Sequence, residues 1–264
     1  MKKLVLLACS ALLFASCGQT TAPVVEVKSL AEMTEDFNAQ VKALYEDSTL
    51  TREEISAKYD ELLNASYEAH KADSLGMTQF VSLMLDAWDY QTLQQKYAEA
   101  DTLTQNNARV QHYMEVLGNY QKVLPGAQYI DIVGPEVRTN EEISVAKVLA
   151  EGKPVLLDFF ASWCPPCKRA IKNEFPELVK QAEGKMNILG IDVWEDKRED
   201  IDKAMTELPI TWRVLVAGGR QNSPADTWGV TSIPSLVLLS ADGTILARGH
   251  ALEEIQEELD KILK

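Results

Sequence analysis

Residues 155–168 read VLLDFFASWCPPCK, and they combine a strand, a turn and the start of a helix. Five apolar residues and one acid, Asp158, form a run that is typical of a buried strand. Two cysteines then stand three positions apart, and Pro166 occupies the first turn of the helix that should follow, where proline is tolerated. A strand that leads into a Cys-x-x-Cys helix start is typical of a redox centre. We therefore expect Cys164 and Cys167 to alternate between a dithiol and a disulfide.

The positions of the cysteines predict different roles for them. Cys164 stands at the helix start, where free N–H groups and the helix dipole stabilise a thiolate, so it is expected to be the attacking thiol. Cys167 follows one turn later on the same face and is expected to be the less accessible, resolving thiol. Pro165 and Pro166 supply neither an N–H donor nor a positive charge, so they stabilise the thiolate less than a histidine would. This predicts a pair that reduces its partners.

Composition limits the compartment and the partners. The 264 residues carry a formal net charge of −14, which disfavours nucleic acid and bare anionic lipid as partners. Lys2 and Lys3 precede an apolar run, and small residues stand directly before Cys17. This pattern predicts a signal peptide over residues 1–16 and a lipidated Cys17. Cleavage by an ordinary signal peptidase nearby is the alternative.

Residues 29–125 are predicted to form a helical domain, preceded by a tether at 17–28. Apolar residues recur at helical spacing, and no proline occurs between residues 29 and 124. Thr51 and Glu54 form a capping box, which predicts a helix start just after Thr51. We expect about four helices packed as a small bundle. This region carries no recognisable catalytic motif.

Residues 126–264 alternate strand-like and helix-like patterns, which predicts a central sheet covered on both faces. Strands are expected at 129–132, 154–160, 186–193, 212–217, 236–239 and 245–248, and helices at 141–149, after Cys164, at 197–208, at 224–228 and from 252 to the end. Gly134 and Pro135 are expected to form a turn. The fold class is therefore α/β, preceded by an all-α domain.

The second half of the chain, residues 127–264, resembles the thioredoxin superfamily, and in particular its exported TlpA/ResA type. The cysteine pair, the strand before it and the sequence TSIPS at 231–235 carry the resemblance. It implies a thioredoxin fold with a helix and a strand inserted at about 197–217. One feature departs from the family, because the sequence EFPEL at 174–178 arrives about one turn later than usual. This departure predicts a longer helix before its proline kink.

The resemblance also implies roles for residues around the cysteines. Asp158 would accept the proton of the resolving thiol, and the alternative is a strand-end acid that reaches solvent. Pro234 would be a cis-proline beside Cys164, and the backbone of Ile233 would bind a substrate segment as a strand does. Further candidate substrate contacts are Trp163, Pro165 and Trp228. The two tryptophans could equally pack in the core.

The function implied by this resemblance is a thiol–disulfide oxidoreductase of the bacterial cell envelope, anchored by lipid and facing the periplasm. Its substrates would be disulfides of exported proteins or of apocytochrome c, and a membrane electron-donor protein would supply the electrons. Neither a cofactor nor a nucleic acid is expected.

Three alternatives share the same residues. An oxidase or isomerase differs only in redox poise. A binding module would use the cysteine pair as a structural disulfide, although a Cys-x-x-Cys loop is a poor staple. A zinc site needs four ligands, and only His250 accompanies the pair in this half of the chain.

Overall fold

The computed structural model describes residues 28–86, 89–219 and 223–264. The predicted signal peptide and Cys17 lie outside these residues, as does all of the predicted tether except Lys28. The chain divides into two compact units after Tyr59. The boundary predicted between residues 125 and 126 falls inside the second unit.

The first unit contains α1 (Leu30–Glu46) and the start of α2 (Arg52–His70). The backbone N–H of Thr51 donates to the Glu54 carboxylate at 2.8 Å, and the N–H of Glu54 donates to the Thr51 hydroxyl at 3.2 Å. This reciprocal pair confirms the predicted capping box and the predicted helix start. Between residues 28 and 59 no side chain is fully buried.

The helical region continues in the second unit with α3 (Ser74–Asp86), α4 (Tyr90–Glu99), α5 (Thr102–Gln105) and α6 (Ala108–Tyr120). It therefore has more helices than the four or so expected. The reason is local capping, because the side chains of Asp89, Asp101 and Asn107 each accept an N–H and begin a new helix. The buried side chains of α2, α3, α4 and α6 include Leu63, Tyr67, Phe80, Leu83, Leu93 and Val110.

Five strands form the central sheet in the order β5-β4-β3-β6-β7. They are β3 (Val155–Phe160), β4 (Asn187–Asp192), β5 (Arg213–Val216), β6 (Ser235–Leu239) and β7 (Ile245–Gly249). Strand β3 is central, parallel to β4 and antiparallel to β6, and β5 extends the sheet beside β4. This order confirms the predicted thioredoxin fold, with α10 (Arg198–Glu207) and β5 as the inserted helix and strand.

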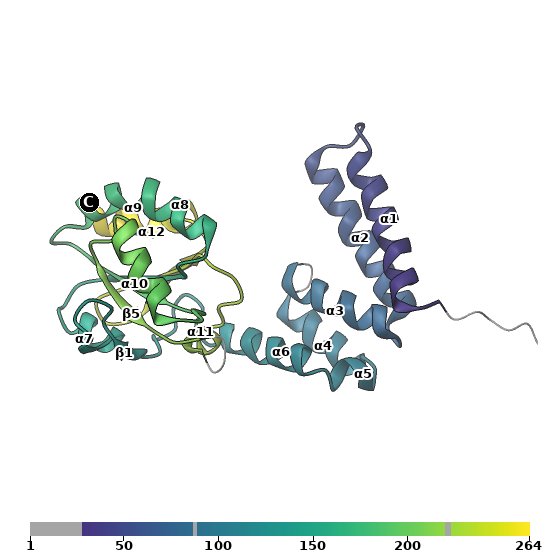
Figure 1. Cartoon of the computed structure of the whole chain (residues 1–264), viewed down its shortest axis with the longest axis horizontal. Helices are drawn as coiled ribbons and strands as arrows, with labels where there is room; N and C mark the ends of the chain where they lie inside the picture. The colour runs from purple at the N-terminus through teal and green to yellow at the C-terminus, as the bar shows by residue number, and fades with distance from the viewer. Residues whose placement is uncertain (1–27, 87–88, 220–222) are drawn as a thin grey trace, which may run out of the picture. The chain divides into compact units, whose positions relative to one another are not determined.

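Helices cover both faces of this sheet, as Figure 1 shows. One face is covered by α8 (Pro165–Asn173), α9 (Phe175–Ala182), α10, the short 3-10 helix η1 (Leu252–Ile255) and α12 (Gln256–Leu263). The other face is covered by α7 (Val145–Leu149) and α11 (Pro224–Thr227). Helices α8 and α9 are separated at Glu174, and Pro176 stands in the first turn of α9, which confirms the predicted interruption.

Side chains of β3 alternate between the two faces. Leu156, Asp158 and Phe160 point to the side of α8 and the cysteines, which we call the cysteine face. Val155, Leu157 and Phe159 point to the side of α7 and α11, which we call the apolar face. Val123 is also buried on the apolar face, so the packing of this core begins before residue 126.

Two predictions about the residues before β3 are wrong. Residues 129–132 were expected to form a strand, but the first strand begins at Val133 and only an isolated bridge joins Gln128 to Thr244. Gly134 and Pro135 were expected in a turn and residues 141–149 in a helix, but β1 (Val133–Pro135) pairs with β2 (Glu142–Ser144) and only α7 is helical. The reason is a contact with the sheet edge. A Cβ atom on Gly134 would lie 2.5 Å from the carbonyl oxygen of Val216, so glycine permits the ribbon to approach β5 closely.

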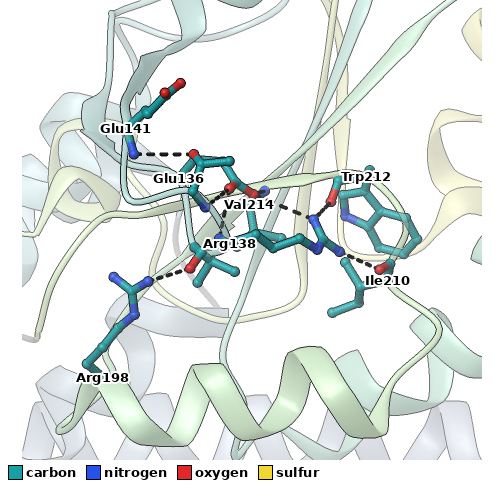
Figure 2. Close-up of polar contacts among 9 residues, drawn as sticks. Glu136, Arg138, Glu141, Arg198, Ile210, Trp212 and Val214 are labelled. Atoms are coloured by element: carbon teal, nitrogen blue, oxygen red, sulfur yellow. Dashed lines mark hydrogen bonds and ion pairs between the residues drawn. The ribbon is translucent and has the colours of Figure 1, made fainter.

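The buried Glu136 and the exposed Arg138 form an ion pair where this ribbon meets β5 (Figure 2). The Glu136 carboxylate accepts the backbone N–H groups of Arg138 and Thr139 at 2.8 Å each, and the Arg138 guanidinium donates to the carbonyl oxygens of Ile210 and Trp212 at 2.6 and 2.9 Å. Burial opposes ionisation of Glu136, but the backbone N–H donors outweigh it and hold its pKa below the ordinary value. The ribbon thus covers the outer edge of the sheet.

Candidate active site

The two cysteines lie at the start of α8. Cys164 is the N-cap residue, and its sulfur is joined to Cys167 in a disulfide. Pro165 and Pro166 follow and have no N–H, so the first helical amide that can donate is that of Cys167, which lies 3.2 Å from the Cys164 Sγ. In this oxidised form Cys164 is 2% exposed and Cys167 1% exposed, so the expected difference in accessibility is small.

The loop before β6 lies against the pair. The Ile233–Pro234 peptide bond is cis, as predicted. The carbonyl oxygen of Ile233 lies 3.8 Å from the Cys164 Sγ. The imidazole Nδ1 of His250, in turn, lies 2.8 Å from the carbonyl oxygen of Pro234. His250 therefore contacts the cis-proline loop. The sequence analysis had considered this residue only as a possible zinc ligand.

The two candidate tryptophans have different surroundings. Trp163 is 45% exposed, and its Nε1 donates to the carbonyl oxygen of Trp194 at 3.2 Å. Trp228 is fully buried, with its ring 5.9 Å from that of Phe159 on the apolar face. The prediction that Trp228 lines a substrate groove is therefore wrong, because its ring fills the core beneath β3. Pro165 is exposed.

Asp158 is buried behind the cysteine pair. It lies on the cysteine face of β3 and is 2% exposed, which rules out the strand-end acid that reaches solvent. No described residue donates a hydrogen bond to its Oδ2. Burial raises the pKa of Asp158 to about 7. Its carboxyl can therefore gain and lose a proton near neutral pH.

Two further buried acids lie near the pair, and the sequence analysis did not single them out. Asp192 of β4 is fully buried in register with Phe160, and a side-chain hydrogen bond links its carboxyl to that of Glu195. Burial and the nearby Glu195 carboxyl raise the pKa of Asp192 to about 9. Glu195 accepts the backbone N–H of Ser162 in the turn before Cys164. Asp192 could have been singled out from the sequence in the same way as Asp158, because it is an acid inside an apolar strand.

The electrostatics of this arrangement follow from the three acids. A carboxylate in a low-dielectric interior near a thiol disfavours the thiolate, and a protonatable carboxyl can exchange a proton with the thiol.

The described residues contain no group of three His, Cys, Asp or Glu side chains that could hold a metal ion. No described helix is both long and apolar enough to cross a membrane.

Fold and site together define a class, the thioredoxin-like domains with a Cys-x-x-Cys centre and a cis-proline loop. The family model described as a thioredoxin-like domain matches residues 142–264. This part of the chain is therefore similar to thioredoxin-like domains.

The relatives are redox proteins by name. The chain is 35% identical over 97 residues to the thiol:disulfide interchange protein CycY of Rhizobium leguminosarum bv. viciae, covering 36% of this chain and 49% of that protein. It is 30% identical over 118 residues to the thiol:disulfide interchange protein HelX of Rhodobacter capsulatus, covering 44% of this chain and 64% of that protein. The matches thus span between about half and two thirds of these relatives. A solved thiol-disulfide oxidoreductase from Bacteroides fragilis is 26% identical and has a TM-score of 0.46, covering 51% of this chain and 98% of that chain.

Proposed function

We propose that the chain is a thiol–disulfide oxidoreductase that reduces disulfides of exported proteins. The observation that supports this proposal is the Cys164–Cys167 disulfide at the start of α8, beside the cis-proline loop and in front of the buried Asp158. A structural staple would explain neither the neighbouring loop nor the unpaired acid.

The proposed reaction has two exchange steps. The Cys164 thiolate attacks one sulfur of the substrate disulfide, forms a mixed disulfide and releases the other substrate sulfur as a thiolate, which takes a proton from water. The Cys167 thiol then loses its proton to Asp158, and its thiolate attacks the Cys164 sulfur. This step forms the Cys164–Cys167 disulfide and releases the second substrate sulfur as a thiolate, which takes a proton from water, and Asp158 returns its proton to water. The substrate gains two electrons and two protons, and the dithiol is oxidised.

The direction of electron flow is argued from the first turn of α8. The Cys164 sulfur faces one helical N–H, that of Cys167, since the two residues between them are prolines. A carboxylate of the nearby buried acids, when ionised, further disfavours a thiolate. A less stabilised thiolate makes the reduced pair a better reductant.

The test is the reduction potential of the pair, measured by equilibrating the protein with glutathione or dithiothreitol mixtures. A value of about −270 mV or lower supports a reductase, whereas a value of about −120 mV would make the protein an oxidase or isomerase. The double variant Cys164→Ser/Cys167→Ser separates catalysis from stapling. Loss of insulin reduction with an intact fold supports the enzyme, and loss of folding supports the structural disulfide.

For location and partners, we propose a lipid anchor at Cys17 after removal of residues 1–16, placing the domain in the bacterial cell envelope facing the periplasm. A dithiol protein of the membrane would then re-reduce the pair, and apocytochrome c is one candidate substrate. Metabolic labelling with a radioactive fatty acid tests the anchor. Label in the wild type that is lost in Cys17→Ser supports it, and an unlabelled wild type contradicts it.

A further inference from the structure

A groove next to the active site is walled on one side by the helical region. It has a volume of about 290 Å³. Its lining comes from α6, from the loop after β4 and from the segment between α11 and the cis-proline. These residues are Arg109, His112, Tyr113, Val116, Trp194, Asp226, Val230 and Thr231. All of them belong to the second compact unit.

The helical wall of this groove is held firmly in place. The Asn119 amide donates to the carbonyl oxygen of Asp226 at 3.1 Å. The half-buried Arg248 guanidinium donates to the carbonyl oxygens of Val123 and Trp228 at 3.1 and 2.8 Å, and it stacks on the Tyr120 ring at 4.6 Å. These contacts fix the end of α6 against α11 and β7, so the groove is a feature of the folded unit.

The groove is continuous with the active site through two of its lining residues. The carbonyl oxygen of Trp194 accepts the Nε1 hydrogen of Trp163, the neighbour of Cys164. Trp194 has a φ of 61°, a strained conformation for a bulky residue. Thr231 stands two residues before Ile233, whose carbonyl oxygen lies beside the Cys164 sulfur. A segment that crosses the cis-proline loop can therefore run on into the groove.

The charges in the groove indicate what it binds. Arg109 stacks on the Tyr113 ring at 5.7 Å and forms no ion pair with any described residue. The acid of the groove, Asp226, already faces His112, with 3.8 Å between Oδ1 and Nε2. The unpaired cation is therefore the guanidinium of Arg109, in a chain whose net charge is strongly negative.

We propose that α6 is part of the substrate site, and that Arg109 selects substrate segments that carry a carboxylate side chain close to the reactive cysteine. The occupant is an extended segment of the disulfide-bearing polypeptide. Thr231 and Ile233 are two residues apart, and two extended residues span about 7 Å, so a carboxylate a few positions from that cysteine is the one to test. This inference rests on the proposed thiol–disulfide function.

The experiment uses the reduced full chain and synthetic peptides whose single cysteine is activated as a pyridyl disulfide. Three peptides carry Asp, Ala or Lys three positions from the cysteine, and release of pyridinethione gives the rate of attack by Cys164. We expect the Asp peptide to react faster than the Lys peptide, and Arg109→Glu to lower that ratio about fivefold, the range of an exposed ion pair. Equal ratios in wild type and Arg109→Glu would overturn the proposal.

Two controls separate this proposal from the function on which it rests. Arg52→Glu makes the same charge change at an exposed position in the first turn of α2, and it should leave the ratio at the wild-type value. Dithiodipyridine is too small to reach the groove from the cysteine, so its rate should be equal in all three proteins. A wild type that fails to react with dithiodipyridine contradicts the proposed function itself, whereas normal reaction without peptide selectivity contradicts only the role of Arg109.

Discussion

The two faces of the central sheet differ in what they bury. On the apolar face, β3 contributes Val155, Leu157 and Phe159 to a core that also holds Trp228. On the cysteine face, the same sheet buries Asp158, whose Oδ2 no described residue hydrogen-bonds, and Asp192, whose carboxyl neighbours that of Glu195. An unpaired buried acid costs stability. The comparison shows that the apolar face stabilises the fold, and that the cysteine face carries costly groups on the same side of the sheet as the reactive sulfurs.

The largest expected effect is on the cysteine face. Cys164→Ser should lower disulfide reduction by on the order of a thousandfold or more, because the attacking thiolate is lost. The thermal transition should stay close to that of the reduced wild type. Insulin reduction together with thermal denaturation checks both. Substantial residual turnover would mean that another group attacks the substrate.

The apolar face should respond in the opposite way. Leu157→Ala removes a fully buried side chain and should lower the free energy of unfolding by about 2–5 kcal/mol. The reduction potential of the cysteine pair should be the same as in the wild type. Urea denaturation and redox titration provide the two values. A marked change in potential would contradict the separation of the two faces.

Asp158→Asn tests the acid behind the pair, and it should slow release of substrate from Cys164 by about a hundredfold. Because burial raises the pKa of Asp158 to about 7, the wild-type rate of this step should rise between pH 6 and pH 8, as the carboxyl becomes ionised. The variant should lack that rise. Single-turnover decay of a mixed disulfide at several pH values measures it, and equal rates in the two proteins would remove Asp158 from the mechanism.

The same substitution should change the pH dependence of stability. The pKa of Asp158 is about 7 in the folded protein and near 4 in an unfolded chain. The folded state therefore holds the extra proton, and the free energy of unfolding falls as pH rises from about 4 to about 7. Asp158 contributes on the order of 3–4 kcal/mol to this decrease in the free energy of unfolding. Urea denaturation across this range should show a smaller fall in Asp158→Asn, and parallel curves would contradict the raised pKa.

The smallest expected effect concerns Glu195 and Asp192. Glu195→Gln keeps an oxygen that can accept the Ser162 N–H and removes a charge, so the reduction potential should rise by less than about 30 mV. Asp192→Asn should change it less, because the pKa of Asp192 is raised to about 9 and the group is uncharged at pH 7. Redox titration of both variants at pH 7 compares them. A larger change in Asp192→Asn would mean that Asp192, not Glu195, carries the charge.

Local sequence patterns determined the centre of this protein. The apolar run of β3, the cysteine spacing and Pro166 predict a strand, a turn and a helix start from neighbouring residues alone, and the structure has all three. Thr51 and Glu54 likewise predict a helix start from a four-residue pattern. Asp158 could be singled out because an acid inside an apolar strand is conspicuous. Such features are visible in sequence because their physical cause spans only a few residues.

Tertiary structure decided the features that depend on distant segments. Gly134 lies in a strand because its backbone meets β5 some 80 residues later. Trp228 lies in the core because its ring packs against that of Phe159. Glu195 accepts the N–H of Ser162, which stands 33 positions earlier in the sequence, in the turn before Cys164. Arg109 likewise lines the groove because tertiary contacts bring α6 next to Trp194 and Thr231. Spacing along the chain encodes which face a side chain takes, but not which distant residue it meets.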